Sequence, residues 1–221
     1  MLRSALLSLL LTACTAAAPP EGGILAIGDS VMAWNGGRGI PEAVAAASGR
    51  PVTDAARSGA HLTHPSAAAA ALGFDVSRQF AGGGWDWVIL TAGGNDLRGA
   101  CGTPAAAAIT DGIVDDRLAG DLPRLVARIR ATGARVAYVG YYDASADGVT
   151  AFTACQSAFD AINARMARLA ARDAGVAFVD AGDVIDPTNR SLYAGDLVHP
   201  SPRGAARIGA AVARAIAAAG G

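Results

Sequence analysis

Residues suited to nucleophilic catalysis stand near both ends of the chain. Ser30, in a Gly-Asp-Ser triplet, directly follows the apolar run Ile24–Ile27, whereas Asp196 and His199 lie close to the carboxyl terminus. A serine hydroxyl is a poor nucleophile until an imidazole accepts its proton and a carboxylate fixes the tautomer of that imidazole. A turn places residues i and i+3 side by side. We therefore expect Asp196 to hold one ring nitrogen of His199 while the other faces Ser30.

Short apolar segments that alternate with alanine-rich stretches must position these residues. Each apolar segment is almost uniformly hydrophobic, which is typical of parallel strands buried on both faces. A chain of 221 residues with 52% hydrophobic content has the size of one domain. We therefore predict a three-layer α/β/α domain over residues 24–221 around a five-stranded parallel sheet. The predicted strands are Ile24–Ile27, Val52–Ala56, Trp87–Thr91, Val136–Gly140 and Val176–Asp180.

Helices are expected between the strands. Ser201 is suited to cap the last of them, and Pro202 suits the first helical position. Apolar residues spaced three and four apart, such as Leu118, Leu122 and Leu125, indicate core-facing helical stripes. The predicted helices are Ile40–Ala47, part of Pro65–Phe80, about Arg117–Ala131, Ala151–Ala174 and Pro202–Ala219.

Loops with distinctive residues follow three of the predicted strands. Ser30 follows the first, Gly59 the second, and Asn95, within Gly-Gly-Asn-Asp, the third, while Asp196 and His199 precede the last helix. Loops from different strands converge at the carboxyl ends of a parallel sheet, where binding sites form. This ordered set resembles the SGNH, or GDSL, hydrolase superfamily over nearly all of the chain after the first 23 residues.

The resemblance implies a flavodoxin-like fold and a role for each motif. Ser30 would be the nucleophile, His199 the base and Asp196 the acid that orients it. The backbone N–H groups of Ser30 and Gly59 and the side-chain amide of Asn95 would form the oxyanion hole. The match at Gly59 rests on little more than Ser-Gly, and valine follows Ser30 where the family name implies leucine.

The substrate is less sharply indicated than the reaction. Similarity to thioesterases, lysophospholipases and arylesterases of the superfamily implies a fatty-acyl or small aryl ester. Deacetylation of a cell-envelope polysaccharide is an alternative, and so is a non-catalytic envelope lipoprotein of the same fold. Trp34, Tyr141 and Tyr142 stand close to the predicted site, where they would either line the substrate pocket or serve ordinary packing.

Composition argues against several other classes of function. The formal charge is −1 and all 18 basic residues are scattered arginines, so no basic stripe predicts nucleic-acid binding. The absence of lysine excludes a Schiff base or a Ser-Lys dyad. His61 and His64 lie in a loop without nearby carboxylates, so we expect a rim or surface role and no metal or other cofactor. Asp29 and Asp96 are expected to support their loops. We expect a monomer.

The first 23 residues resemble an export signal. Arg3 followed by a short apolar stretch is typical of a signal peptide over residues 1–13. Leu-Thr-Ala-Cys ending at Cys14 resembles a bacterial lipobox, which implies lipidation of Cys14, a linker over residues 14–23 and a lipid-anchored periplasmic or envelope location. Cleavage after Ala18 and a buried amino-terminal helix are the alternatives. In an oxidising compartment, Cys101 and Cys155 would form a disulfide or remain two buried thiols.

Overall fold

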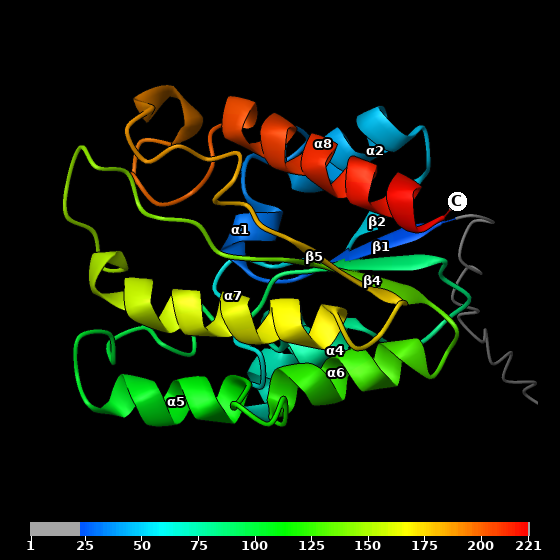
Figure 1. Cartoon of the computed structure of the whole chain (residues 1–221), viewed down its shortest axis with the longest axis horizontal. Coiled ribbons are helices and arrows are strands. Elements are labelled where there is room, and N and C mark those ends of the chain that lie inside the picture. The colour runs from blue at the N-terminus through cyan, green and yellow to red at the C-terminus, as the bar shows by residue number, and fades with distance from the viewer. Residues whose placement is uncertain (1–22, 221) are drawn as a thin grey trace, which may run out of the picture.

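A five-stranded parallel sheet with the order β2-β1-β3-β4-β5 forms the centre of the computed structural model, which describes residues 23–220 (Figure 1). Its residues in β1 and β3 are all buried, because helices cover both faces of the sheet. The predicted three-layer α/β fold is therefore confirmed. The predicted signal peptide and Cys14 lie outside the described residues. The strands are β1 Ile24–Ile27, β2 Val52–Asp54, β3 Trp87–Leu90, β4 Arg135–Val139 and β5 Val176–Val179.

Two helical layers enclose the sheet. Helices α2 (Ile40–Ser48) and α8 (Pro202–Ala219) cover one face (Figure 1). The other face is covered by α4 (Val76–Gln79), α5 (Ala105–Ile113), α6 (Asp121–Arg130) and α7 (Gln156–Ala170). None of the helices within residues 23–220 has both the length and the apolarity needed to cross a membrane. The remaining short elements are α1 (Ser30–Ala33), α3 (Ala67–Ala69), the π-helical turn η1 (Ala70–Phe74), and the 3₁₀ turns η2 (Thr153–Cys155) and η3 (Arg190–Leu192).

Small residues let α8 pack closely on α2. A Cβ atom at Gly209 would stand 2.4 Å from the Cβ atom of Ala43, so a larger residue there would push the two helices apart. Ser201 caps α8 as predicted, because its hydroxyl accepts a hydrogen bond from the N–H of Gly204 at 3.2 Å. This cap sets where the helix begins, immediately after the loop that carries His199.

The observed helices differ from the predicted ones most at α5, at the start of α6 and at both ends of α7. Helix α5 was not predicted, because its alanine-rich sequence has few large apolar residues to reveal a stripe. Leu118 is not part of α6; it has a φ of 64° in a turn where the Asp115 carboxylate accepts backbone N–H bonds. Helix α7 begins at Gln156 rather than at residue 151, because a turn and η2 occupy the preceding residues, and it ends at Ala170 rather than at residue 174.

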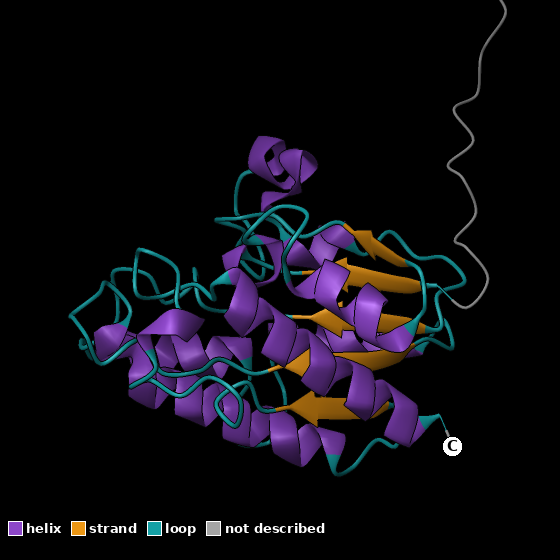
Figure 2. Cartoon of the chain, turned by 90° about the horizontal axis from the view of Figure 1, so that it is seen from above, coloured by secondary structure: helices purple, strands orange, loops and turns teal. Residues whose placement is uncertain are grey.

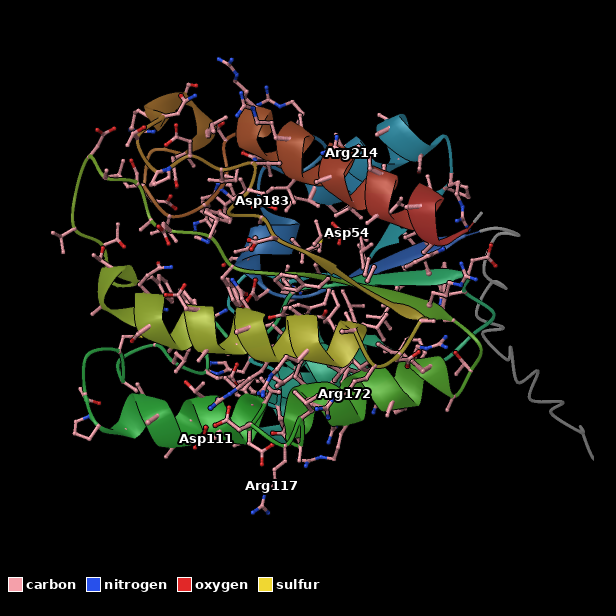
Figure 3. The ribbon with its side chains drawn as sticks, viewed as in Figure 1. Asp54, Asp111, Arg117, Arg172, Asp183 and Arg214 are labelled. Carbon is pink, nitrogen blue, oxygen red and sulfur yellow. A yellow bond between two sulfur atoms is a disulfide. The ribbon has the colours of Figure 1, made fainter. Side chains whose placement is uncertain are left out.

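The carboxyl ends of all the strands point to the same edge of the sheet, where the loops gather (Figure 2). A disulfide between Cys101 and Cys155 joins the loop after β3 to the start of α7 at this end. Charges of both signs lie around the outside in Figure 3. The exposed side chains that it labels are Asp54, Asp111, Arg117, Arg172, Asp183 and Arg214.

Candidate active site

Ser30, His199 and Asp196 form a continuous hydrogen-bonded chain. Ser30 begins α1 directly after β1, and its Oγ lies 2.7 Å from Nε2 of His199. The opposite ring nitrogen, Nδ1, lies 2.6 Å from Oδ2 of Asp196. A proton on Nδ1 that is donated to the carboxylate leaves Nε2 free to accept the serine proton. The structure thus brings together the three residues expected to form a serine nucleophile, its base and an orienting acid.

The Asp196 carboxylate also shapes the loop that carries His199. Its Oδ1 accepts hydrogen bonds from the backbone N–H groups of Val198 at 3.1 Å and His199 at 3.0 Å. Partial burial alone would raise the pKa of Asp196, but the hydrogen bonds from the His199 ring and from these N–H groups hold that pKa below its ordinary value. Asp196 is therefore ionised throughout the neutral range and holds both the backbone and the ring of its neighbour.

Trp34 covers one face of the His199 ring. The two rings are stacked, with centroids 3.8 Å apart and an interplanar angle of 9°. The next residue, Asn35, donates a hydrogen bond from Nδ2 to the carbonyl of Pro200 at 2.9 Å. The end of α1 is therefore attached to the loop of the base at two adjacent positions. This contact is with the base, and the pocket role predicted for Trp34 stays a prediction.

Three donors lie in the predicted oxyanion loops. Asn95 is buried, and its Nδ2 donates one hydrogen to the carbonyl of Ala60 at 2.9 Å, which leaves the second amide hydrogen available. The backbone N–H groups of Ser30 and Gly59 make no hydrogen bond within residues 23–220. Gly59 has a φ of 84°, a conformation that glycine adopts without strain. Such unpaired donors are suited to a negatively charged oxygen.

Asp29 and Asp96 form hydrogen bonds that support the surrounding loops. The buried Asp29 carboxylate accepts hydrogen bonds from the Val31 N–H at 3.0 Å, the Thr91 hydroxyl at 3.2 Å and the Tyr141 hydroxyl at 2.5 Å. Burial raises the pKa of Asp29, although these hydrogen bonds partly oppose the shift. Asp96 accepts the Leu62 N–H at 2.9 Å. Burial likewise raises the pKa of Asp96.

His61 and His64 lie against each other near Asp96, so the expectation that no carboxylate lies near them is wrong. Their rings meet edge to face with centroids 5.3 Å apart, and Nδ1 of His61 is 3.9 Å from Asp96 Oδ1. Within residues 23–220, no group of three or more histidine, cysteine, aspartate or glutamate side chains is placed to hold a metal ion.

A small cavity opens beside Ser30 and Asn95. Its volume is about 40 Å³. Tyr141 and Tyr142 line it as part of its wall, and the Tyr142 hydroxyl donates to the carbonyl of Val198 at 2.9 Å. Sequence reasoning missed the other aromatic walls, Phe152 and Phe159, because η2 and α7 bring them to the site from the long segment after β4. The only sequence feature that pointed to these two phenylalanines was their position between the fourth and fifth predicted strands.

The directions of the pKa shifts lead to a prediction about pH. Acidification should lower kcat/KM because the base that accepts the Ser30 proton must be neutral, while the depressed pKa of Asp196 keeps its carboxylate ionised on mild acidification. The measurement is kcat/KM for an activated ester across the acidic range. A rate that stays flat to well below about pH 5 would contradict the assignment of an imidazole base.

Comparison with known proteins places this geometry in a family. The model of the GDSL-like Lipase/Acylhydrolase family matches residues 26–207. No curated protein matches the sequence. That family match covers most of the chain and contains every residue of the hydrogen-bonded chain described above.

Solved structures share the fold at low sequence identity. Est24, a carbohydrate acetylesterase from Sinorhizobium meliloti, superposes with a TM-score of 0.68 at 18% identity, covering 89% of this chain and 98% of that one. TesA gives a TM-score of 0.61 at 21% identity, with 89% and 99% covered. A carbohydrate esterase family 2 enzyme from Corynascus thermopiles gives 0.62 at 22% identity, with 93% and 68% covered. The chain therefore belongs to the GDSL-like lipase/acylhydrolase family and is a hydrolase of ester bonds built on the SGNH fold.

Proposed function

We propose that the protein is a serine esterase that removes short, acetyl-sized acyl groups from its substrate through an acyl-enzyme on Ser30. The small volume of the cavity beside Ser30 carries this proposal. The cavity has a volume of about 40 Å³ and aromatic rings form part of its wall, and both features favour a short acyl group over a long one. A longer chain would meet the rings of Tyr141, Phe152 and Phe159. The named activity of Est24, a carbohydrate acetylesterase, supports the same substrate class.

The proposed mechanism is two-step acyl transfer. Ser30 Oγ attacks the ester carbonyl carbon while its proton passes to Nε2 of His199, which lies 2.7 Å away. The developing oxyanion accepts hydrogen bonds from the N–H groups of Ser30 and Gly59 and from the amide of Asn95. His199 then gives its proton to the leaving alcohol. Water, activated by the same imidazole, attacks the acyl-enzyme and releases the acid and free Ser30.

The ionised Asp196 carboxylate balances the positive charge that the imidazole gains during the reaction. When His199 carries two protons, the carboxylate 2.6 Å from Nδ1 stabilises the positive ring. Asp29 makes no contact with the reacting atoms and is not assigned an acid or base role.

Acyl-chain preference tests the proposed substrate class. We expect kcat/KM for p-nitrophenyl acetate to exceed that for the octanoate by at least about tenfold, because a long chain overfills the cavity. Phe152→Ala should shift the preference towards longer chains by removing part of the cavity wall. Phe178→Ala, which removes a phenylalanine outside this cavity, is the matched control. Wild-type enzyme that prefers the octanoate would contradict the proposal.

We further propose that the protein is exported and anchored in the cell envelope by a lipid on Cys14. The Leu-Thr-Ala-Cys sequence supports the anchor, and the Cys101–Cys155 disulfide is suited to an oxidising compartment. Intact-mass measurement on protein from membrane fractions should show acyl chains on an amino-terminal Cys14, and Cys14→Ser should abolish them. Mature protein whose mass shows no acyl chain on Cys14 would contradict the anchor.

A further inference from the structure

One phenolic oxygen contacts both loops of the proposed chemistry. The Tyr141 hydroxyl donates to Oδ2 of Asp29 at 2.5 Å and accepts the backbone N–H of Gly94 at 2.7 Å. Asp29 directly precedes the nucleophile Ser30, and Gly94 directly precedes the oxyanion donor Asn95. The Tyr141 hydroxyl therefore contacts the residue before the nucleophile and the residue before the oxyanion donor. The distance between Ser30 and Asn95 sets the geometry of the reaction.

The bridge extends across three neighbouring strands. Asp29 follows β1, Gly94 follows β3 and Tyr141 follows β4, and β3 lies between the other two in the sheet. The phenol reaches across the end of β3 to a carboxylate 112 positions earlier in the chain. Thr91 at the end of β3 donates to the other oxygen of the same carboxylate. These contacts tie the ends of β1, β3 and β4 together.

Helix α7 fixes the position of Tyr141 itself. The backbone N–H of Tyr141 donates to Oδ1 of Asn163 at 3.0 Å, and Nδ2 of Asn163 donates to the backbone carbonyl of Tyr141 at 2.7 Å. The ring stacks on Phe159, also on α7, with centroids 4.5 Å apart. A side chain held at its backbone and its ring presents its hydroxyl at a defined place, as preorganised sites require.

Burial keeps the phenol in the state that the bridge needs. Burial and the nearby Asp29 charge raise the pKa of Tyr141 well above its ordinary value, so the hydroxyl retains the proton that it donates. Gly94 has no Cβ, and a Cβ there would stand 3.1 Å from the phenolic oxygen. The glycine thus permits the close approach of the backbone to the ring.

We propose that Tyr141 is a positioning residue for ester hydrolysis, whose hydroxyl holds the nucleophile Ser30 in register with the oxyanion donor Asn95. This inference rests on the proposed function of Ser30 and Asn95. Loss of the hydroxyl would leave both loops free to move by fractions of an ångström while the aromatic wall remains in place. Because reaction geometry is sensitive to such shifts, the chemical step should suffer more than substrate binding.

Tyr141→Phe is the direct test, with p-nitrophenyl acetate as the substrate. We expect kcat to fall by on the order of 100-fold while KM changes by less than about threefold. Tyr138→Phe is the matched control. It also removes a fully buried phenol hydroxyl from β4, but that hydroxyl donates to the Ala92 carbonyl and forms no hydrogen bond with Asp29 or Gly94. This control should retain wild-type kcat.

A double-mutant cycle separates positioning from general loosening of the structure. If Tyr141 acts by placing Asn95, the loss of kcat in the Tyr141→Phe, Asn95→Ala double variant should be smaller than the product of the two single losses. Should Tyr141→Phe fail to fold, Asn163→Ala, which frees the Tyr141 backbone, should lower kcat several-fold with KM little changed. Each variant is assayed well below its melting temperature.

Two results would overturn the inference. One is a folded Tyr141→Phe variant with kcat within about twofold of wild type. The other is a double variant whose loss of kcat equals the product of the losses in Tyr141→Phe and Asn95→Ala. Either result leaves the proposed function intact if wild-type enzyme hydrolyses the ester and Ser30→Ala does not. Failure of the proposed function itself would appear as equal rates for wild type and Ser30→Ala.

Discussion

Replacement of Ser30 by alanine should lower kcat for p-nitrophenyl acetate by at least on the order of 10⁴-fold, because no other group at the site can form the acyl-enzyme. The residual rate would come from the oxyanion donors and from substrate binding. The fold should persist, since the hydrogen bond to the His199 ring is the only one that the Ser30 hydroxyl makes among the described residues. Circular dichroism and thermal unfolding beside the steady-state assay would establish this.

Non-additivity makes the prediction for Ser30 more specific. His199→Ala should cause a loss of similar size, and the Ser30→Ala, His199→Ala double variant should be no worse than either single variant, because the two side chains act as a unit. Ser48→Ala is a suitable control, because its hydroxyl donates to the Val44 carbonyl within α2 and accepts the N–H of Arg50 just after the carboxyl end of that helix. Losses that multiply in the double variant would contradict a shared role.

Asn95→Ala should lower kcat by about 10²- to 10³-fold with little change in KM, because its amide hydrogen is needed where negative charge develops in the transition state. The loss has a second source in this protein. Asn95 Nδ2 also holds the Ala60 carbonyl at 2.9 Å, so its removal would free the segment that presents the Gly59 N–H.

Asn95→Asp provides the comparison for this prediction. Aspartate keeps the shape of the side chain but removes both amide donors and adds a negative charge facing the oxyanion. We expect a loss at least as large as that of Asn95→Ala, measured as kcat on the same acetate ester. A variant of either kind with near-wild-type kcat would show that Asn95 does not stabilise the oxyanion.

The sequence was sufficient to predict the architecture and the hydrogen-bonded chain of Ser30, His199 and Asp196. Uniformly apolar strands reveal a sheet buried on both faces, and the loops after such strands must converge at one edge. Short motifs in those loops then bring the three residues together although 169 positions separate Ser30 from His199. Residue types and the order of the loops can both be read directly from the sequence.

Contacts across the sheet were not predictable in the same way. Trp34 and Tyr141 were expected as pocket residues, but the stacking of Trp34 on His199 and the bridge from Tyr141 to Asp29 depend on tertiary distances. Helix α5 escaped prediction because alanine repeats carry little amphipathic signal. The aromatic walls at Phe152 and Phe159 depend on where η2 and α7 lie over the site.

Covalent labelling by a fluorophosphonate tests directly whether Ser30 is an activated nucleophile, because this reagent phosphonylates an activated serine and the adduct resists hydrolysis. We expect loss of esterase activity in step with about one label per chain, located by peptide mass spectrometry on Ser30 and absent from Ser30→Ala and His199→Ala. An active enzyme that takes up no label on Ser30, or that loses activity through a label on another residue, would contradict it.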